Sequence, residues 1–81
     1  MKTNDIKKGM RIKLACGWYG TMFDNMKGNT RLVDVEGDFR EIGSVYSHDI
    51  VAVKIDEMWD FNIEYTPDQL KLKHSVEAMG W

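Results

Sequence analysis

The chain has 81 residues, which is enough for one small domain with a single hydrophobic core. Its hydrophobic content of 43% and charged content of 30% argue against both a disordered chain and a membrane protein. The net charge of −2 is not typical of a dedicated nucleic-acid-binding domain. The opening residues have no apolar stretch of a secretory signal behind them, so we expect a cytoplasmic protein.

The first strand is predicted at residues 10–16, where apolar residues alternate with Arg11 and Lys13. Gly9 permits a tight turn before it. Cys16 is the only cysteine of the chain, so it has no internal disulfide partner. We expect Cys16 to be a small buried hydrophobic residue at the end of this strand.

Two aromatic residues, Trp18 and Tyr19, lie between Gly17 and Gly20. The glycines indicate a turn or bulge before a second strand at residues 21–23. At such a turn at most one of the two rings points easily into the core. The other ring is then an exposed contact residue, since aromatic side chains are favoured anchors at protein interfaces.

The middle of the chain is predicted to form two further hairpins. Residues 24–29 are rich in Asn, Asp and Gly and form a loop, and residues 30–35 form the third strand. A turn at residues 36–38 leads to a fourth strand at residues 39–45, with a bend expected at Gly43.

After a short helical turn at residues 46–49, residues 50–55 are the most strand-like run in the chain. Apolar and polar residues then alternate from residue 59 to residue 65. This alternation predicts a sixth strand that packs one aromatic face on the core. That face would carry Trp59, Phe61, Ile63 and Tyr65.

A helix is predicted over residues 66–80. Thr66 is a suitable N-cap, Pro67 fits the first helical position, and Gln69 completes a capping box. A stripe of apolar residues should pack against the strands; it consists of Leu72, Val76 and Met79. Trp81 follows the helix and either folds back on the domain or joins a partner, so self-association through this helix is one expectation.

These elements predict a mainly β, single-domain chain over residues 1–81: a small closed or partly closed barrel of five or six antiparallel strands (residues 6–65) with one C-terminal α-helix. Residues 6–14 resemble the opening of SH3-like barrels, including KOW-type domains. This resemblance implies that the chain forms a small SH3-like barrel. Longer stretches resemble a family of small uncharacterised proteins of tailed phages and prophages. The stretches are Gly17-Trp18, Asp24-Asn25-x-x-Gly28-Asn29-Thr30-Arg31, Glu41-Ile42-Gly43-Ser44-Val45-Tyr46-x-His48-Asp49-Ile50 and residues 65–72. The resemblance implies a bacterial-host setting and carries over no functional residue.

No catalytic residue, metal ligand set or cofactor site is predicted. Ser47, His48 and Asp49 contain the residue types of a catalytic triad, but sequence neighbours cannot adopt the geometry that a triad needs. Neither histidine has a second ligand at metal-binding spacing. We therefore expect a protein that is not an enzyme.

The leading hypothesis is a non-enzymatic binding module, a phage or prophage accessory protein that contacts a protein partner through loops and aromatic side chains. The candidate contact residues are Trp18, Tyr19, Tyr46 and Trp81. The alternative is nucleic-acid binding by a basic N-terminal face, because residues 1–20 carry a net charge of +4 and residues 41–60 one of −4. Its candidate residues are Lys7, Lys8, Arg11 and Lys13.

Overall fold

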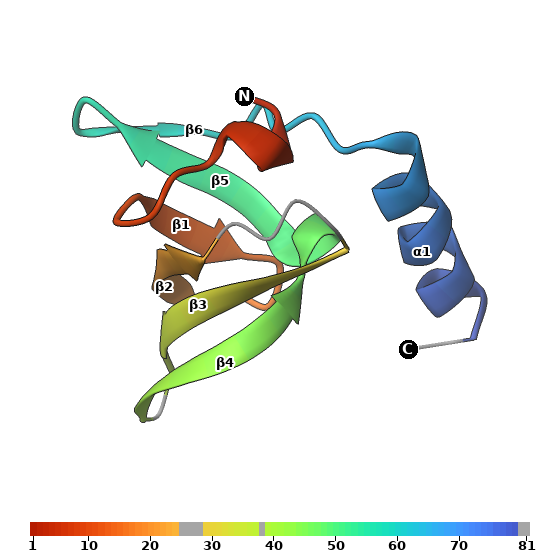
Figure 1. Cartoon of the computed structure of the whole chain (residues 1–81), viewed down its shortest axis with the longest axis horizontal. Coiled ribbons are helices and arrows are strands. Elements are labelled where there is room, and N and C mark those ends of the chain that lie inside the picture. The colour runs from red at the N-terminus through yellow and green to blue at the C-terminus, as the bar shows by residue number, and fades with distance from the viewer. Residues whose placement is uncertain (25–28, 38, 80–81) are drawn as a thin grey trace.

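The structure is a computed structural model of the chain and describes residues 1–24, 29–37 and 39–79. Within these residues, six strands, two 3₁₀ turns and one helix follow one another. Figure 1 shows how they are arranged. In chain order they are η1 (Thr3–Asp5), β1 (Arg11–Leu14), β2 (Tyr19–Asp24), β3 (Thr30–Glu36), β4 (Arg40–Tyr46), η2 (Ser47–Asp49), β5 (Ile50–Ile55), β6 (Met58–Asp60) and α1 (Pro67–Ala78).

All six strands belong to one antiparallel sheet, in the order β4-β3-β2-β1-β5-β6. The prediction of a mainly β chain with six antiparallel strands and one C-terminal helix is confirmed. Strands β4 and β6 lie at the two ends of this order. Closure of the sheet into a barrel stays a prediction. The predicted loop at residues 24–29 falls mostly outside the described residues.

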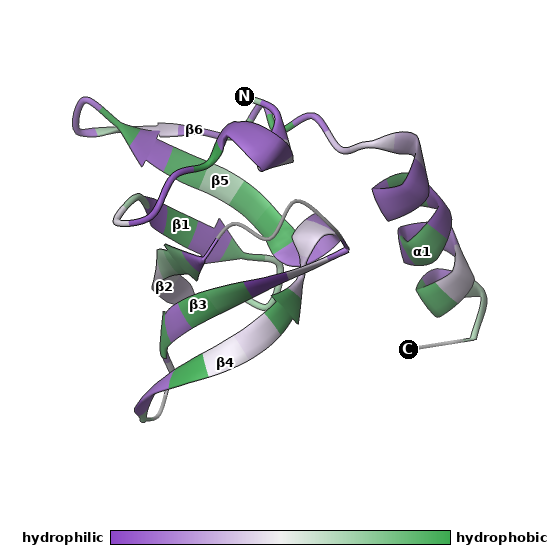
Figure 2. Cartoon of the chain, viewed as in Figure 1, coloured by the Kyte–Doolittle hydropathy of each residue, from purple (hydrophilic) through white to green (hydrophobic). Residues whose placement is uncertain are grey.

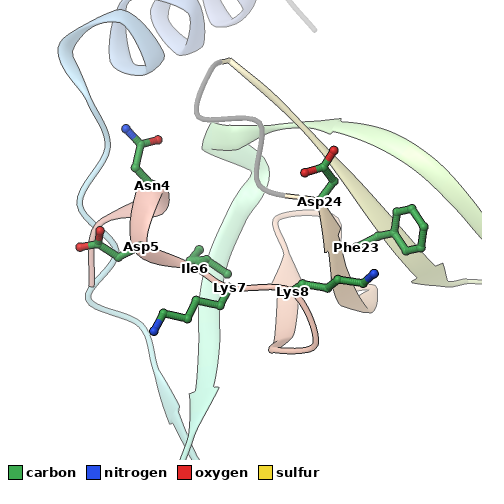
Figure 3. A pocket seen from close by; sticks show the side chains of 7 residues that line it. All are labelled: Asn4, Asp5, Ile6, Lys7, Lys8, Phe23 and Asp24. Atoms are coloured by element: carbon green, nitrogen blue, oxygen red, sulfur yellow. The ribbon is translucent and has the colours of Figure 1, made fainter.

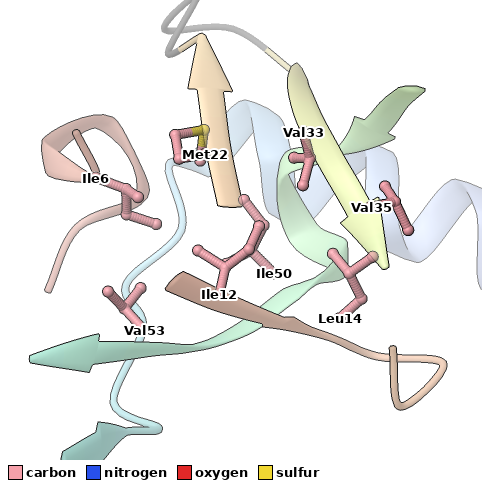
Figure 4. Close-up of a cluster of buried hydrophobic side chains, with 8 residues drawn as sticks. All are labelled: Ile6, Ile12, Leu14, Met22, Val33, Val35, Ile50 and Val53. Carbon is pink, nitrogen blue, oxygen red and sulfur yellow. The ribbon is translucent and has the colours of Figure 1, made fainter. Parts of the chain in front are cut away.

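One face of the sheet, here called the inner face, carries the core. Along β1 hydrophobic residues alternate with hydrophilic ones, and the hydrophobic ones are buried (Figure 2). Along β3 every second residue from Arg31 to Val35 is buried, so each strand buries one side. Ile6, between η1 and β1, is fully buried and extends the core beyond the sheet. The core residues are Ile6, Ile12, Leu14, Met22, Val33, Val35, Ile50 and Val53 (Figure 4). The opposite side of the sheet is called the outer face.

Arg31 is fully buried on the inner face of β3, in line with Val33 and Val35. Its guanidinium donates hydrogen bonds to Asn4 Oδ1 at 2.7 Å and to the Thr30 carbonyl at 2.8 Å. Burial lowers the pKa of Arg31. The hydrogen bond to Asn4 links η1 to the sheet. The alternation of polar and apolar residues in the sequence does not by itself show that this arginine is buried.

The prediction of a sixth strand over residues 59–65 is wrong in its extent. Strand β6 ends at Asp60, and the Phe61 side chain is 61% exposed. The Asn62 amide donates to the Asp60 carboxylate at 2.9 Å, and the Ile63 amide donates to the Phe61 carbonyl at 3.1 Å. These local bonds turn the backbone away from β5, so Phe61 does not reach the core.

Residues beyond this turn pair with the N-terminus instead of with β5. The Thr3 amide donates to the Glu64 carbonyl at 3.0 Å, and the Glu64 amide donates to the Met1 carbonyl at 2.9 Å. The N-terminal segment is therefore the pairing partner of Glu64, in a parallel bridge between Lys2 and Glu64.

The start of α1 is as predicted. The Gln69 amide donates to Thr66 Oγ1 at 3.2 Å, and the Thr66 amide donates to Gln69 Oε1 at 3.0 Å, which completes a capping box with Pro67 at the first turn. The Gln69 side chain also accepts a bond of 2.6 Å from the fully buried Thr3 hydroxyl. A cap predicted from local sequence thus also joins the helix to η1.

The prediction that α1 packs an apolar stripe on the strands is wrong. The helix lies beside the sheet and packs against η2 (Figure 1), and Met79 is 65% exposed while Leu72 and Val76 are half-buried. The Tyr65 hydroxyl donates to the Ile50 carbonyl at 2.7 Å, which fixes the start of the helix next to η2. The helices of the described chain are too short and polar to cross a bilayer.

The prediction that Cys16 is buried is also wrong, because its side chain is exposed. Strand β1 ends at Leu14, and a turn follows in which the Gly17 amide donates to the Leu14 carbonyl at 2.9 Å. Gly17 has a φ of 94°, which favours glycine. This turn directs the Cys16 thiol away from the core.

Candidate functional site

A groove opens on the inner face of the sheet, between the β1–β2 turn and strand β4. Its volume is about 320 Å³, near the lower end of the range for ligand-binding pockets. The floor is formed by core side chains of β1, β3 and β4, and the Cys16 turn and η2 form the rim. The lining residues are Leu14, Ala15, Cys16, Trp18, Val35, Glu41, Gly43, Ser44, Val45 and Asp49.

Gly43 leaves a notch in the wall that β4 contributes. In the β3–β4 register Gly43 lies opposite Val33, and its neighbours on the inner face, Glu41 and Val45, lie opposite Val35 and Arg31. A Cβ atom at Gly43 would meet no heavy atom within 4 Å. The inner face of β4 is therefore open beside the core at this position.

Trp18 lines the same groove as Gly43. A Cβ atom at Gly37 would lie 2.5 Å from the Cε3 and Cζ3 carbons of the Trp18 ring, so the indole lies directly on the Gly37 backbone. Only glycine permits this approach. The ring nevertheless remains 45% exposed.

A second depression, of about 400 Å³, continues the groove toward the end of β4. The two share Ser44, Val45 and Asp49, and the second also contains Tyr46. The Tyr46 ring stacks on His48 at a centroid distance of 5.0 Å and is 42% exposed. Of the two predicted contact residues, Trp18 lines the groove, whereas Tyr46 occupies an outer-face position of β4, like Ile42, and lines only the second depression.

The formally charged side chains that line these two depressions are carboxylates. Glu41 lies on the inner face of β4 and Asp49 lies in η2, and no lysine or arginine of the described residues lines either depression. His48 is 8% exposed, and its Nε2 lies 3.8 Å from Asp49 Oδ1. The groove combines an apolar floor with negatively charged rims.

Tyr19 was predicted together with Trp18, but the structure separates the two residues. Tyr19 lies on the outer face, 38% exposed, and its ring contacts Trp59 at a centroid distance of 5.4 Å. The Lys13 ammonium lies 5.8 Å from the Tyr19 ring centroid and 5.6 Å from that of Phe61. Lys13, Tyr19, Trp59 and Phe61 form one cluster, here called the outer aromatic cluster.

The other predicted cations do not form one continuous phosphate-binding face. Lys8 lies over the Phe23 ring at 5.1 Å, whereas Arg11 pairs with Glu36 at 2.6 Å. Lys7 and Lys8 line an open depression of about 560 Å³ at the start of β1 (Figure 3). This depression has mixed charge, since it also contains Asp5 and Asp24.

The remaining sequence-based expectations concern chemistry. Ser47 is fully buried and His48 nearly so, within the short turn that the sequence predicts. In the part of the chain that the structure describes, no three His, Cys, Asp or Glu side chains come together as a metal site. Trp81 lies outside the described residues.

Sequence reasoning missed Gly43 and Phe61 as site residues. For Gly43 a signal was present, because glycine in a strand commonly marks a close approach of another chain or a ligand. For Phe61 the clean alternation pointed to the core, and only the pairing of Glu64 with the N-terminus reverses that reading.

The chain was also compared with known families, with curated proteins and with solved structures, and it matches none of them.

Proposed function

We propose that the chain is a non-enzymatic module that binds a protein partner in the groove beside β4. The observation that carries the proposal is the notch at Gly43, which leaves apolar core side chains reachable from solvent between the Trp18 ring and strand β4. Large aromatic residues beside an apolar depression are typical of protein interfaces. The resemblance to tailed-phage proteins supports an accessory role in the cytoplasm of a bacterial host.

The experiment uses the full chain carrying a photo-crosslinker on Cys16, which lies exposed at the rim of the groove. Bacterial lysate is treated with nuclease, captured on the chain and irradiated. We expect a protein crosslinked to Cys16 that is absent with Gly43→Val, whose side chain enters the notch where a Cβ atom meets open space. The matched control, Ile42→Val, changes an exposed residue on the outer face of the same strand and should retain the crosslink.

Recovery of nucleic acid alone, or a crosslinked protein that Gly43→Val leaves unchanged, would overturn the proposal. Size-exclusion chromatography of the crosslinked sample identifies a second copy of the chain, including one joined through the exposed apolar residues of α1, by its mass. Self-association through α1 remains the alternative protein contact predicted from the sequence.

A second candidate function is binding of single-stranded nucleic acid by the outer aromatic cluster. The observation that favours it is the Lys13 ammonium between the rings of Tyr19 and Phe61. Exposed rings can stack on bases while a neighbouring cation contacts phosphate. Arg11 contributes less to such a surface because Glu36 neutralises it.

Fluorescence anisotropy with a labelled twenty-nucleotide thymidine strand and a duplex of equal length, both at low salt, tests this candidate. We expect single-strand binding that weakens with salt and is lost with Tyr19→Ala. Gly43→Val is the matched control, because it alters the opposite face of the sheet. A flat titration for both oligonucleotides removes this candidate.

A further inference from the structure

Strand β4 is an unusually regular edge for a small sheet. It pairs with β3 over seven consecutive residue pairs with no register shift, whereas the β1–β5 and β2–β3 pairings are each interrupted by one. Among the described residues, β4 pairs with no other strand. Every second residue of such a strand therefore directs its N–H and C=O groups away from the sheet.

Proteins commonly protect such an edge with proline, lysine, a bulge or a short strand. The sequence of β4, Arg-Glu-Ile-Gly-Ser-Val-Tyr, has no proline and no lysine, and its last five residues are uncharged. Those five residues span about 17 Å of extended chain. The edge is thus long enough to pair with a short peptide strand.

The groove determines what such a strand would carry. Side chains of an added strand alternate between the two faces of the sheet, so every second one would meet the inner face of β4. One of these positions faces the notch at Gly43, whose floor is Leu14, Val35 and Val45. An apolar side chain fits that position.

The charges on either side indicate the neighbouring residues. Glu41 precedes the notch on the inner face of β4, and Asp49 lines the groove beyond Val45. Because no lysine or arginine of the described residues lines the groove, cationic side chains on the peptide would meet carboxylates there without repulsion.

We propose that β4 accepts a basic, extended peptide segment of the partner protein as an additional strand, with an apolar side chain over Gly43 and cationic side chains toward Glu41 and Asp49. This inference rests on the proposed protein-binding function and specifies the chemistry of the bound segment. Main-chain hydrogen bonds along the edge would supply affinity, and the notch and the carboxylates would supply specificity.

The test selects binders from a displayed library of random twelve-residue peptides on the immobilised full chain, with counterselection on the Gly43→Val chain. We expect enriched peptides to carry a net positive charge and alternating apolar residues. A synthetic copy of the best peptide should bind Gly43→Val at least tenfold more weakly than the natural chain. Glu41→Gln should weaken binding about two- to fivefold, as expected for one exposed ion pair.

Two further readouts distinguish strand addition from docking of another kind. The peptide should slow amide hydrogen exchange in β4 while leaving β6 unchanged. It should also slow alkylation of Cys16 at the groove rim. The control variant Tyr19→Ala, which changes the outer face of β2, should bind the peptide as the natural chain does. A melting temperature of Gly43→Val no lower than that of the natural chain shows that its fold is intact.

Three outcomes of these experiments would overturn the inference. These outcomes are enrichment of acidic or pattern-free peptides, no enrichment above the Gly43→Val chain, and unchanged exchange in β4 with a bound peptide. A β4-mediated dimer of this chain would equally overturn it. If the Cys16 crosslink still depends on Gly43 while no peptide binds, the inference fails and the proposed function stands; loss of both results rejects both.

Discussion

Gln69 joins three parts of the molecule, and its removal gives the sharpest test of how α1 is held. Its Oε1 atom accepts from the Thr3 hydroxyl at 2.6 Å and from the Thr66 amide at 3.0 Å. Gln69 is the buried residue of α1, with a side chain 1% exposed. Gln69→Ala removes this one acceptor, and with it both hydrogen bonds, from a helix that otherwise packs against η2.

The expected loss of stability follows from the two donor groups that lose their acceptor in Gln69→Ala. The fully buried Thr3 hydroxyl loses its acceptor, and a stranded buried donor costs about 1–3 kcal/mol. The half-buried Thr66 amide loses a capping bond worth about 0.5–1 kcal/mol. Gln69→Ala should therefore lower the free energy of unfolding by about 3 kcal/mol, against a total of about 4–12 kcal/mol for a chain of this length.

A double-mutant cycle with Thr3→Val separates the stranded hydroxyl from other losses. Thr3→Val removes the donor at nearly constant shape and should cost about 1 kcal/mol. In the double variant no buried hydroxyl lacks an acceptor. Its loss of unfolding free energy should therefore be smaller than the sum of the two single losses by about 1–2 kcal/mol. Urea unfolding, followed by tryptophan fluorescence and by far-ultraviolet circular dichroism, gives the free energy of unfolding of the natural chain, the two single variants and the double variant.

A cost of Gln69→Ala below about 1 kcal/mol, or single costs that add within about 0.3 kcal/mol, would refute this account of how the helix is anchored. A loss of helical dichroism at lower urea than the fluorescence change would show that α1 detaches before the sheet unfolds.

Three further predictions concern packing and ionisation. Val76→Asp should lower the free energy of unfolding by less than about 1 kcal/mol because Val76 is half-buried, whereas Val33→Asp should unfold the chain because Val33 is fully buried. Equal decreases of the melting temperature in the two variants would contradict this difference. Burial, and then Asp49, raise the pKa of Tyr65, so its contribution to stability is present below the ordinary tyrosine pKa and is lost as pH rises through the raised pKa. Absorbance titration should show one late-ionising phenol that is absent from Tyr65→Phe. The hydrogen bond from Arg40 lowers the pKa of Asp34. The contribution of Asp34 to the stability of the fold is therefore present above the ordinary aspartate pKa and is lost as pH falls through the lowered pKa. Arg40→Gln should return the pKa of Asp34 toward its ordinary range in a carboxyl NMR titration.

The sequence by itself determined the elements whose signals are local. The strand at residues 50–55 and the cap at Thr66 were predicted at their observed positions, because strand propensity and capping depend on residues close together in the chain. The turn before Ile50 is likewise local, and so is the alternation that places Ile12 and Leu14 in the core.

The tertiary structure alone decided which faces are covered and which remain open. Residues 59–65 alternate as a buried strand does, yet the N-terminus pairs with Glu64 and leaves Phe61 exposed. The notch at Gly43 likewise depends on a pairing register and on the position of the Trp18 turn, both set by residues far apart in sequence. The alternation of polar and apolar residues predicts which residues of a strand share a side. Only the pairing of segments distant in sequence decides which side is packed and which strand edge stays free.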